Sequence, residues 1–304
     1  MKLLISLLSA GVMLFVMGCS SDSETQPTDN KIYIVTTTGM IADAVEHVAG
    51  EYATVEALMA PGVDPHLYKA TGSDLEKLNK ADLVFYNGLH LEGKMTDVLA
   101  KLGKKKTVVG LGDNLPHESL INYGTVHDPH IWFDVKLWSG TLPLIADALK
   151  AFDAPHADTY TANAAAYQKE LLELHAWVQE QLNKLPANQR ILVTAHDAFE
   201  YFGKAYGMEV KGLQGISTVS EYGLKDVTNV VDMLVNRKIK AVFVESSVSD
   251  KALKAVVEGA ADKGHTVAIG GTLFSDAMGA ADKPEGKYVG MVKYNVKTIV
   301  EALR

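Results

Sequence analysis

The tripeptide Asp-Pro-His occurs twice in this chain, at residues 64–66 and 128–130. Proline fixes its own backbone and pushes the preceding residue toward an extended conformation, so each copy predicts a rigid loop that aims a histidine. Two more polar residues could act with these histidines: His196 at the end of the segment ILVTAH, and Asp276 in the segment GGTLFSDAMG. Three neutral imidazoles and one carboxylate can together bind a divalent transition metal. The candidate metal ligands are therefore His66, His130, His196 and Asp276.

The other histidines lack this combination of motif and position. His127 directly precedes the second motif, but it has no counterpart before the first motif, where Gly62 and Val63 stand. We therefore expect His127 to be a solvated loop residue. We expect structural or exposed roles for His47, His90, His117, His156, His175 and His265. No pair of the four candidate ligands has the i, i+4 spacing of the metalloprotease motif H-E-x-x-H.

Two acidic residues could support the candidate ligands. A metal-bound histidine usually donates its other ring N–H to a carboxylate or a carbonyl. Glu245, in the segment VFVESS, and Asp197, directly after His196, are placed to face the same region. The alternative for both is an ordinary polar residue that caps the helix after a strand.

The elements that must position these residues follow a regular alternation. Short β-branched segments alternate with helical stretches such as 40–49, 71–80 and 288–303, which predicts right-handed βαβ units and parallel sheets. The predicted strands are KIYIVTTT, TVEALMA, DLVFYNG and KTVVGLG in the first half, and RILVTAH, VKGLQG, KAVFVESS and HTVAIGG in the second.

A long helix interrupts this alternation. Residues 157–185 contain no Gly or Pro and carry apolar residues at helical spacing, and Pro186 ends the pattern. The sequence thus predicts an α/β fold with two lobes, 31–156 and 186–304, each a roughly four-stranded parallel sheet, joined by a rigid helix at 157–185. Ligands of parallel sheets bind beyond the carboxyl ends of the strands, so we expect the site in the cleft between the lobes.

The first residues of the chain predict export of the protein, and we do not expect them to belong to its folded part. Residues 1–18 have the positive start and apolar run of a signal peptide, and Gly18 precedes the single cysteine, Cys19, as in a bacterial lipobox. We expect an acylated Cys19, a polar tether over 19–30, and a location outside the cytoplasmic membrane. The alternative is a plain secretory signal with an incidental cysteine. The formal net charge of −8 argues against nucleic-acid binding.

The segments quoted above, together with DPHIWFDVKLW and the stretch EVKGLQGIST, resemble the metal-binding receptors of bacterial zinc and manganese ABC importers, of the TroA type. The resemblance covers nearly all of the chain after the leader. It implies a metal ion held between two α/β lobes by His66, His130, His196 and Asp276. The zinc-specialised branch often has a histidine-rich loop before the second ligand, but residues 111–126 contain a single histidine, His117. The manganese-preferring branch often has glutamate at the third ligand position, which is His196 here.

The resemblance implies a monomeric solute-binding lipoprotein that captures zinc or manganese and passes it to a membrane permease, without catalysing a reaction. One alternative is a secreted zinc hydrolase, which would keep a ligand position open to water and place a glutamate nearby as a base. Another is a surface adhesin with a metal-stabilised fold. The sequence leaves the physiological metal open among zinc, manganese and iron.

Overall fold

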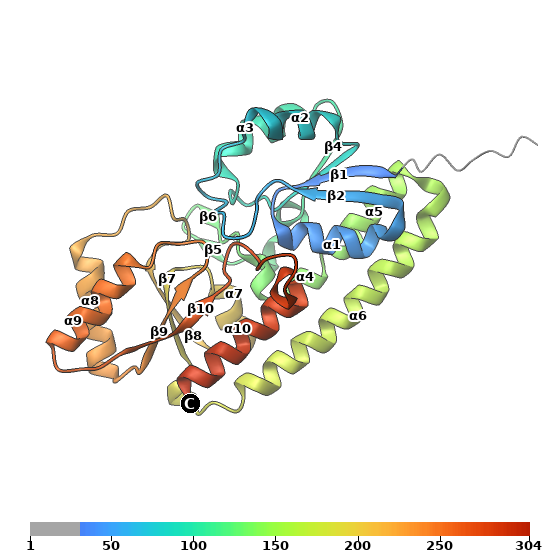
Figure 1. The fold of residues 1–304 in the computed structure, drawn as a ribbon. Helices are drawn as coiled ribbons and strands as arrows, with labels where there is room; N and C mark the ends of the chain where they lie inside the picture. The colour runs from blue at the N-terminus through green and yellow to red at the C-terminus, as the bar shows by residue number, and fades with distance from the viewer. Residues whose placement is uncertain (1–30) are drawn as a thin grey trace, which may run out of the picture. The chain divides into compact units, whose positions relative to one another are not determined.

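The computed structural model describes residues 31–304, which form one compact unit. The predicted signal peptide, tether and Cys19 lie outside the described residues. The unit contains two four-stranded parallel sheets, with strand orders β2-β1-β3-β4 and β10-β9-β7-β8, as the α/β prediction requires (Figure 1).

The first lobe is built on strands that all run in one direction. Its sheet consists of β1 (Ile32–Thr36), β2 (Ala53–Ala57), β3 (Leu83–Tyr86) and β4 (Thr107–Gly110). Its helices are α1 (Gly39–Ala49), α2 (Gly72–Lys80), α3 (Thr96–Leu102), α4 (Val135–Ser139) and α5 (Leu142–Phe152). All four predicted strands of this lobe are confirmed.

The second lobe repeats the same design. Its sheet consists of β7 (Ile191–His196), β8 (Glu209–Gln214), β9 (Ala241–Glu245) and β10 (Ala268–Leu273). Its helices are α7 (Glu200–Tyr206), α8 (Leu224–Arg237), α9 (Lys251–Asp262) and α10 (Tyr288–Leu303). The four strands predicted for this half of the chain are also confirmed.

The helix α6 (Ala157–Leu182) joins the two lobes and passes along both (Figure 1). Its 26 residues make it about 39 Å long at a rise of ~1.5 Å per residue. Its buried side chains include Leu171, Leu174, Val178 and Leu182, at the spacing of one helix face. One hydrophobic cluster contains this face together with residues of both sheets, for example Ile34 of β1 and Leu192 of β7. The lobes therefore share a continuous core along α6.

A small antiparallel hairpin, β5 (Asn122–Tyr123) and β6 (Val126–His127), was not predicted. Each of its strands has two residues, too few to show an alternation of apolar and polar side chains. Gly124 makes the turn with a φ of 66°, a conformation that glycine adopts without strain. The hairpin leads directly into the second Asp-Pro-His motif.

Candidate metal centre

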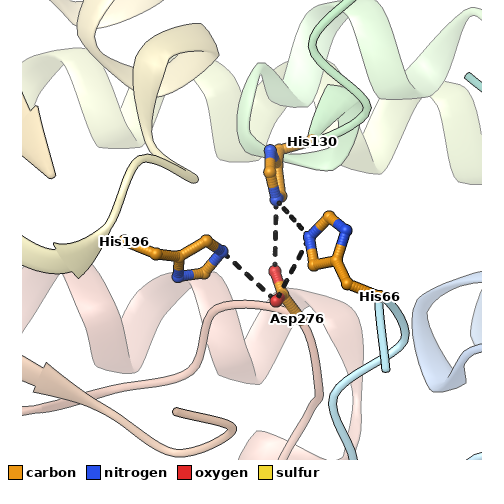
Figure 2. A group of neighbouring side chains, drawn as sticks. All are labelled: His66, His130, His196 and Asp276. Atoms are coloured by element: carbon orange, nitrogen blue, oxygen red, sulfur yellow. Dashed lines mark hydrogen bonds and ion pairs between the residues drawn. The ribbon is translucent and has the colours of Figure 1, made fainter. Parts of the chain in front are cut away.

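The four candidate ligands come together at one point between the lobes (Figure 2). His66 lies in the loop after β2, and His130 follows β6, so both belong to the first lobe. His196 is the last residue of β7, and Asp276 lies in the loop after β10. Parallel strands direct the residues that follow them to one edge of their sheet, which is why His66, His196 and Asp276 meet here, whereas His130 is brought in by the loop after the β5–β6 hairpin.

The spacing of the four side chains fits a tetrahedral metal ion. One potential ligand atom from each residue lies within 4.8 Å of the other three. Asp276 carboxylate oxygens lie 3.4 Å from Nε2 of His130, 3.3 Å from Nε2 of His196 and 3.8 Å from Nε2 of His66. Nε2 of His66 lies 3.4 Å from Nε2 of His130. A tetrahedron with metal–ligand bonds of about 2.1 Å has edges of about 3.4 Å, so the four atoms can surround a zinc-sized ion.

Burial also favours a cation at this point. None of the four side chains is more than 3% exposed. Both carboxylate oxygens of Asp276 and Nε2 of His196 are buried and have no hydrogen-bond partner among the described residues. Buried polar atoms without partners are costly, and a bound cation would satisfy all three.

The two Asp-Pro-His motifs have the same local geometry. Oδ1 of Asp64 accepts a hydrogen bond from the backbone N–H of His66 at 2.8 Å, and Oδ1 of Asp128 accepts one from His130 at 2.9 Å. Each aspartate thereby fixes the backbone of the histidine two residues later, with the rigid proline between them. The repeated motif is thus a repeated loop that presents an imidazole.

Beyond this shared geometry the two aspartates differ. Oδ1 of Asp128 also lies 2.7 Å from Nδ1 of the His130 ring, so it orients the imidazole with Nε2 toward Asp276. Asp64 instead accepts a hydrogen bond from the Thr218 hydroxyl of the second lobe at 2.6 Å. Asp128 was not predicted as a ring partner of His130, although its position two residues before His130 in the repeated motif was a usable signal.

Glu245 supports His196 from the neighbouring strand. Oε1 of Glu245 accepts a hydrogen bond from the His196 backbone N–H at 2.8 Å, and Oε2 lies 2.6 Å from Nδ1 of the ring. Because β7 and β9 are adjacent and parallel, their last residues meet at the same edge. Asp197 has a different environment: it accepts a hydrogen bond from the Tyr123 hydroxyl at 3.0 Å. Within residues 31–304 its carboxylate forms no hydrogen bond or ion pair with any of the four candidate ligands.

Two further residues hold the second motif in place. The side-chain amide of Asn87, after β3, donates to the carbonyl of Pro129 at 2.9 Å. The Tyr201 hydroxyl of α7 donates to the carbonyl of Asp128 at 3.1 Å. Neither residue carries a sequence signal for this role, because the contacts depend on how β3 and α7 pack against a loop distant in sequence. His127 lies outside the cluster, with its ring centroid 5.5 Å from that of His117.

The charges of the site are strongly coupled. Burial opposes protonation of His130, but Asp128 and Asp276 outweigh it and raise its pKa to about 9. Burial likewise opposes protonation of His196, and Glu245 and Asp276 raise its pKa well above 6.5. Burial lowers the pKa of His66 to about 3. Burial would raise the pKa of Asp276, but the neighbouring imidazoles hold it well below its usual range. The carboxylates thus create a site that attracts positive charge.

The comparisons with known proteins confirm the resemblance seen in the sequence. The chain is 49% identical over 289 residues to the manganese-binding lipoprotein MntA of Bacillus subtilis, with 94% of each chain covered. It is 47% identical over 282 residues to the zinc-binding protein TroA of Treponema pallidum, with 92% of each covered. The solved structure of that periplasmic zinc-binding protein matches with a TM-score of 0.88, over 90% of this chain and 99% of that one.

The family model described as "Zinc-uptake complex component A periplasmic" matches residues 34–302. This range contains both sheets except the first two residues of β1, and it includes the joining helix and all four residues of the candidate metal centre. The chain therefore belongs to the ZnuA family.

Proposed function

We propose that this protein is the extracytoplasmic binding component of an ABC importer for divalent metal ions. It captures zinc or manganese between its lobes and delivers the ion to a membrane permease. The observation that carries the proposal is the set of four buried ligand residues, contributed equally by two lobes, whose ligand atoms all lie within 4.8 Å of one another. The metal is the cargo of the protein, and the ligands are His66, His130, His196 and Asp276.

The donor set suits more than one cargo. Imidazole nitrogen favours zinc, whereas manganese is a harder ion that favours carboxylate oxygen. The relatives differ in the same way, since one is named for manganese and another for zinc. We therefore assign both ions to the site, with their supply outside the membrane deciding which one occupies it.

A binding role fits the site better than catalysis. A zinc hydrolase keeps one coordination position open to water. Here four side chains are available as ligands, and each is almost fully buried, which supports a closed site. The relatives named as lipoproteins support an acyl anchor on Cys19 and a location outside the cytoplasmic membrane. We propose that the protein acts as a monomer. Within residues 31–304 no helix combines the length and the apolar character needed to cross a membrane.

Zinc and manganese titrations of two alanine variants test this function. His130→Ala removes a ligand and should weaken zinc affinity by more than about 100-fold, beyond the loss that an outer partner of a ligand typically causes. His127→Ala, three residues away, is the matched control and should change the affinity little. Equal losses in both variants, or no high-affinity binding by the unmodified protein, would overturn the assignment.

A further inference from the structure

A set of unpaired lysines lies at the amino edge of the first lobe's sheet. Strands β1, β3 and β4 are neighbours in this sheet, and each begins within three residues of an exposed lysine. We call this set the amino-edge lysines: Lys31, Lys80, Lys101, Lys104 and Lys105. Lys101 lies in the last turn of α3, just before the last two. The acidic residues that precede strands at this edge are Glu51 and Asp82, so lysine is in excess.

The amino-edge lysines are among the lysines of residues 31–304 that form no ion pair with an acidic side chain. Eight lysines elsewhere in the described part of the chain form ion pairs with acidic side chains, for example Lys77 with Glu56 at 2.7 Å. None of the amino-edge lysines has such a partner among residues 31–304. Lys106, the next residue, is used structurally, since it donates to backbone carbonyls at the end of α2. Within residues 31–304 the amino-edge lysines therefore have no acidic partner that would compete with an external anion.

An apolar groove lies beside these cations. It has a volume of about 230 Å³, runs between α2 and α3, and is lined by Leu75, Leu78, Val98 and Leu102 together with Lys101 and Lys105. Leu75 is 38% exposed. Lysines at the border of an exposed apolar surface match the boundary of a bilayer, where anionic headgroups meet acyl chains.

The start of the described chain places this edge near a membrane. Lys31 directly precedes β1, and Cys19 lies 12 residues before it. Twelve residues span at most about 40 Å when fully extended. If Cys19 carries the proposed acyl anchor, Lys31 stays within about 40 Å of the membrane surface, and the other amino-edge lysines lie along the same edge of the sheet. This step rests on the proposed function.

We propose that the amino-edge lysines and the α2–α3 groove dock the first lobe onto anionic phospholipid headgroups of the membrane that holds the anchor. The chain as a whole is acidic, with a formal net charge of −8, so an anionic membrane attracts the protein only where cations are in excess. The loop of His66 follows β2 at the opposite, carboxyl edge of the same sheet. Docking by the amino edge therefore turns that end of the metal site away from the bilayer. In this orientation the site faces the solution from which it would capture a metal ion.

This orientation also explains why the contact must be weak. A permease lies in the membrane, so the protein has to leave the docked orientation before it can deliver its ion. Exposed lysines without a deep anion pocket give attraction that salt screens and that is easily reversed. The amino-edge lysines thus hold the protein in a loading position between deliveries.

Vesicle binding tests the proposal. The unit 31–304 contains both sheets and all three hydrophobic clusters, so it can be used without the anchor. At low salt it should sediment with vesicles of phosphatidylglycerol and phosphatidylcholine, and it should stay in solution with phosphatidylcholine alone. Lys104→Gln with Lys105→Gln should lower the partition coefficient about tenfold or more. The control pair, Lys238→Gln with Lys240→Gln, removes two exposed lysines before β9 in the other lobe and should change it less than about twofold.

Equal losses in the two variant pairs, or no binding to anionic vesicles at low salt, would overturn the docking surface. Binding to a soluble polyanion such as polyphosphate but not to the vesicles would also overturn it, since the occupant would then not be a bilayer. The zinc affinity of the same proteins tests the proposed function independently of vesicle binding. The lysine variants should keep it, and an unmodified protein without zinc binding would overturn the proposed function while leaving the vesicle result intact.

Discussion

At the scale of single residues, the site depends on the acidic groups behind the imidazoles. Asp128 lies against Nδ1 of His130, and Glu245 lies against Nδ1 of His196. An acceptor at Nδ1 holds the proton on that nitrogen and leaves the lone pair of Nε2 free for a metal. The Nε2 atoms of His130 and His196 consequently face the carboxylate of Asp276, and Nε2 of His66 lies 3.8 Å from it (Figure 2).

Glu245→Gln tests this support. The amide can still accept one hydrogen bond from His196, but it lacks the negative charge that raises the basicity of the ring, so zinc affinity should fall about 10-fold to 100-fold. The control is Asp197→Asn, which alters an acidic residue adjacent to His196 whose carboxylate contacts Tyr123 instead. Competition titrations with a chromogenic zinc chelator would measure both. An unchanged affinity in Glu245→Gln would contradict the role of this carboxylate.

The four candidate ligands were predictable because each one follows a strand or lies in a repeated motif. Their partners were less predictable. Glu245 could be named because it ends a predicted strand, but Asn87 and Tyr201 act through backbone carbonyls of a loop distant in sequence. Such contacts leave no spacing rule in the chain, because they depend on the packing of β3 and α7 against that loop.

At the scale of elements, α6 is the structural connection between the lobes. It contacts helices of the first lobe and α10 of the second, and one of its faces lies in the shared core. Its start was predicted at residue 157, where the structure has it, and its end was predicted at 185, three residues beyond Leu182. Residues just before a proline are disfavoured in helical conformation, and the helix ends well before Pro186. Helix ends depend on such local geometry more than on periodicity.

Two adjacent leucines allow a direct test of this helix. Leu171 is fully buried in the shared core, whereas Leu172 is 43% exposed. Leu171→Ala should lower the free energy of unfolding by about 2–5 kcal/mol, because it removes buried contacts and leaves a cavity. Leu172→Ala should lower it by less than about 1 kcal/mol. Urea unfolding followed by circular dichroism measures both, and equal losses would show that α6 does not pack through this face.

At the scale of the whole described unit, the lobes are connected by side chains as well as by α6. The Tyr288 hydroxyl at the start of α10 donates to the carbonyl of Trp132 at 2.6 Å, and the indole N–H of Trp132 donates to the carbonyl of Ser275 at 3.0 Å. These bonds join the loop after His130 to the loop that carries Asp276. Two ligands from different lobes are thereby held close together by bonds that involve no metal.

Removal of the metal should therefore change the free energy of unfolding strongly and the radius of gyration of the protein only slightly. Zinc binds the folded site and not the separated ligands of the unfolded chain, so free zinc at about 1,000 times its dissociation constant should add about 4 kcal/mol to the free energy of unfolding. Domains that close around ligands on flexible hinges become more compact on binding, but here a shared core and a continuous helix leave no flexible loop to act as a hinge. We expect X-ray scattering with and without a chelator to give radii of gyration that differ by less than about 0.5 Å, while thermal unfolding shifts upward with zinc. A clear compaction on adding zinc would show that the lobes separate in the metal-free protein, and that the bonds of Trp132 and Tyr288 do not hold them together.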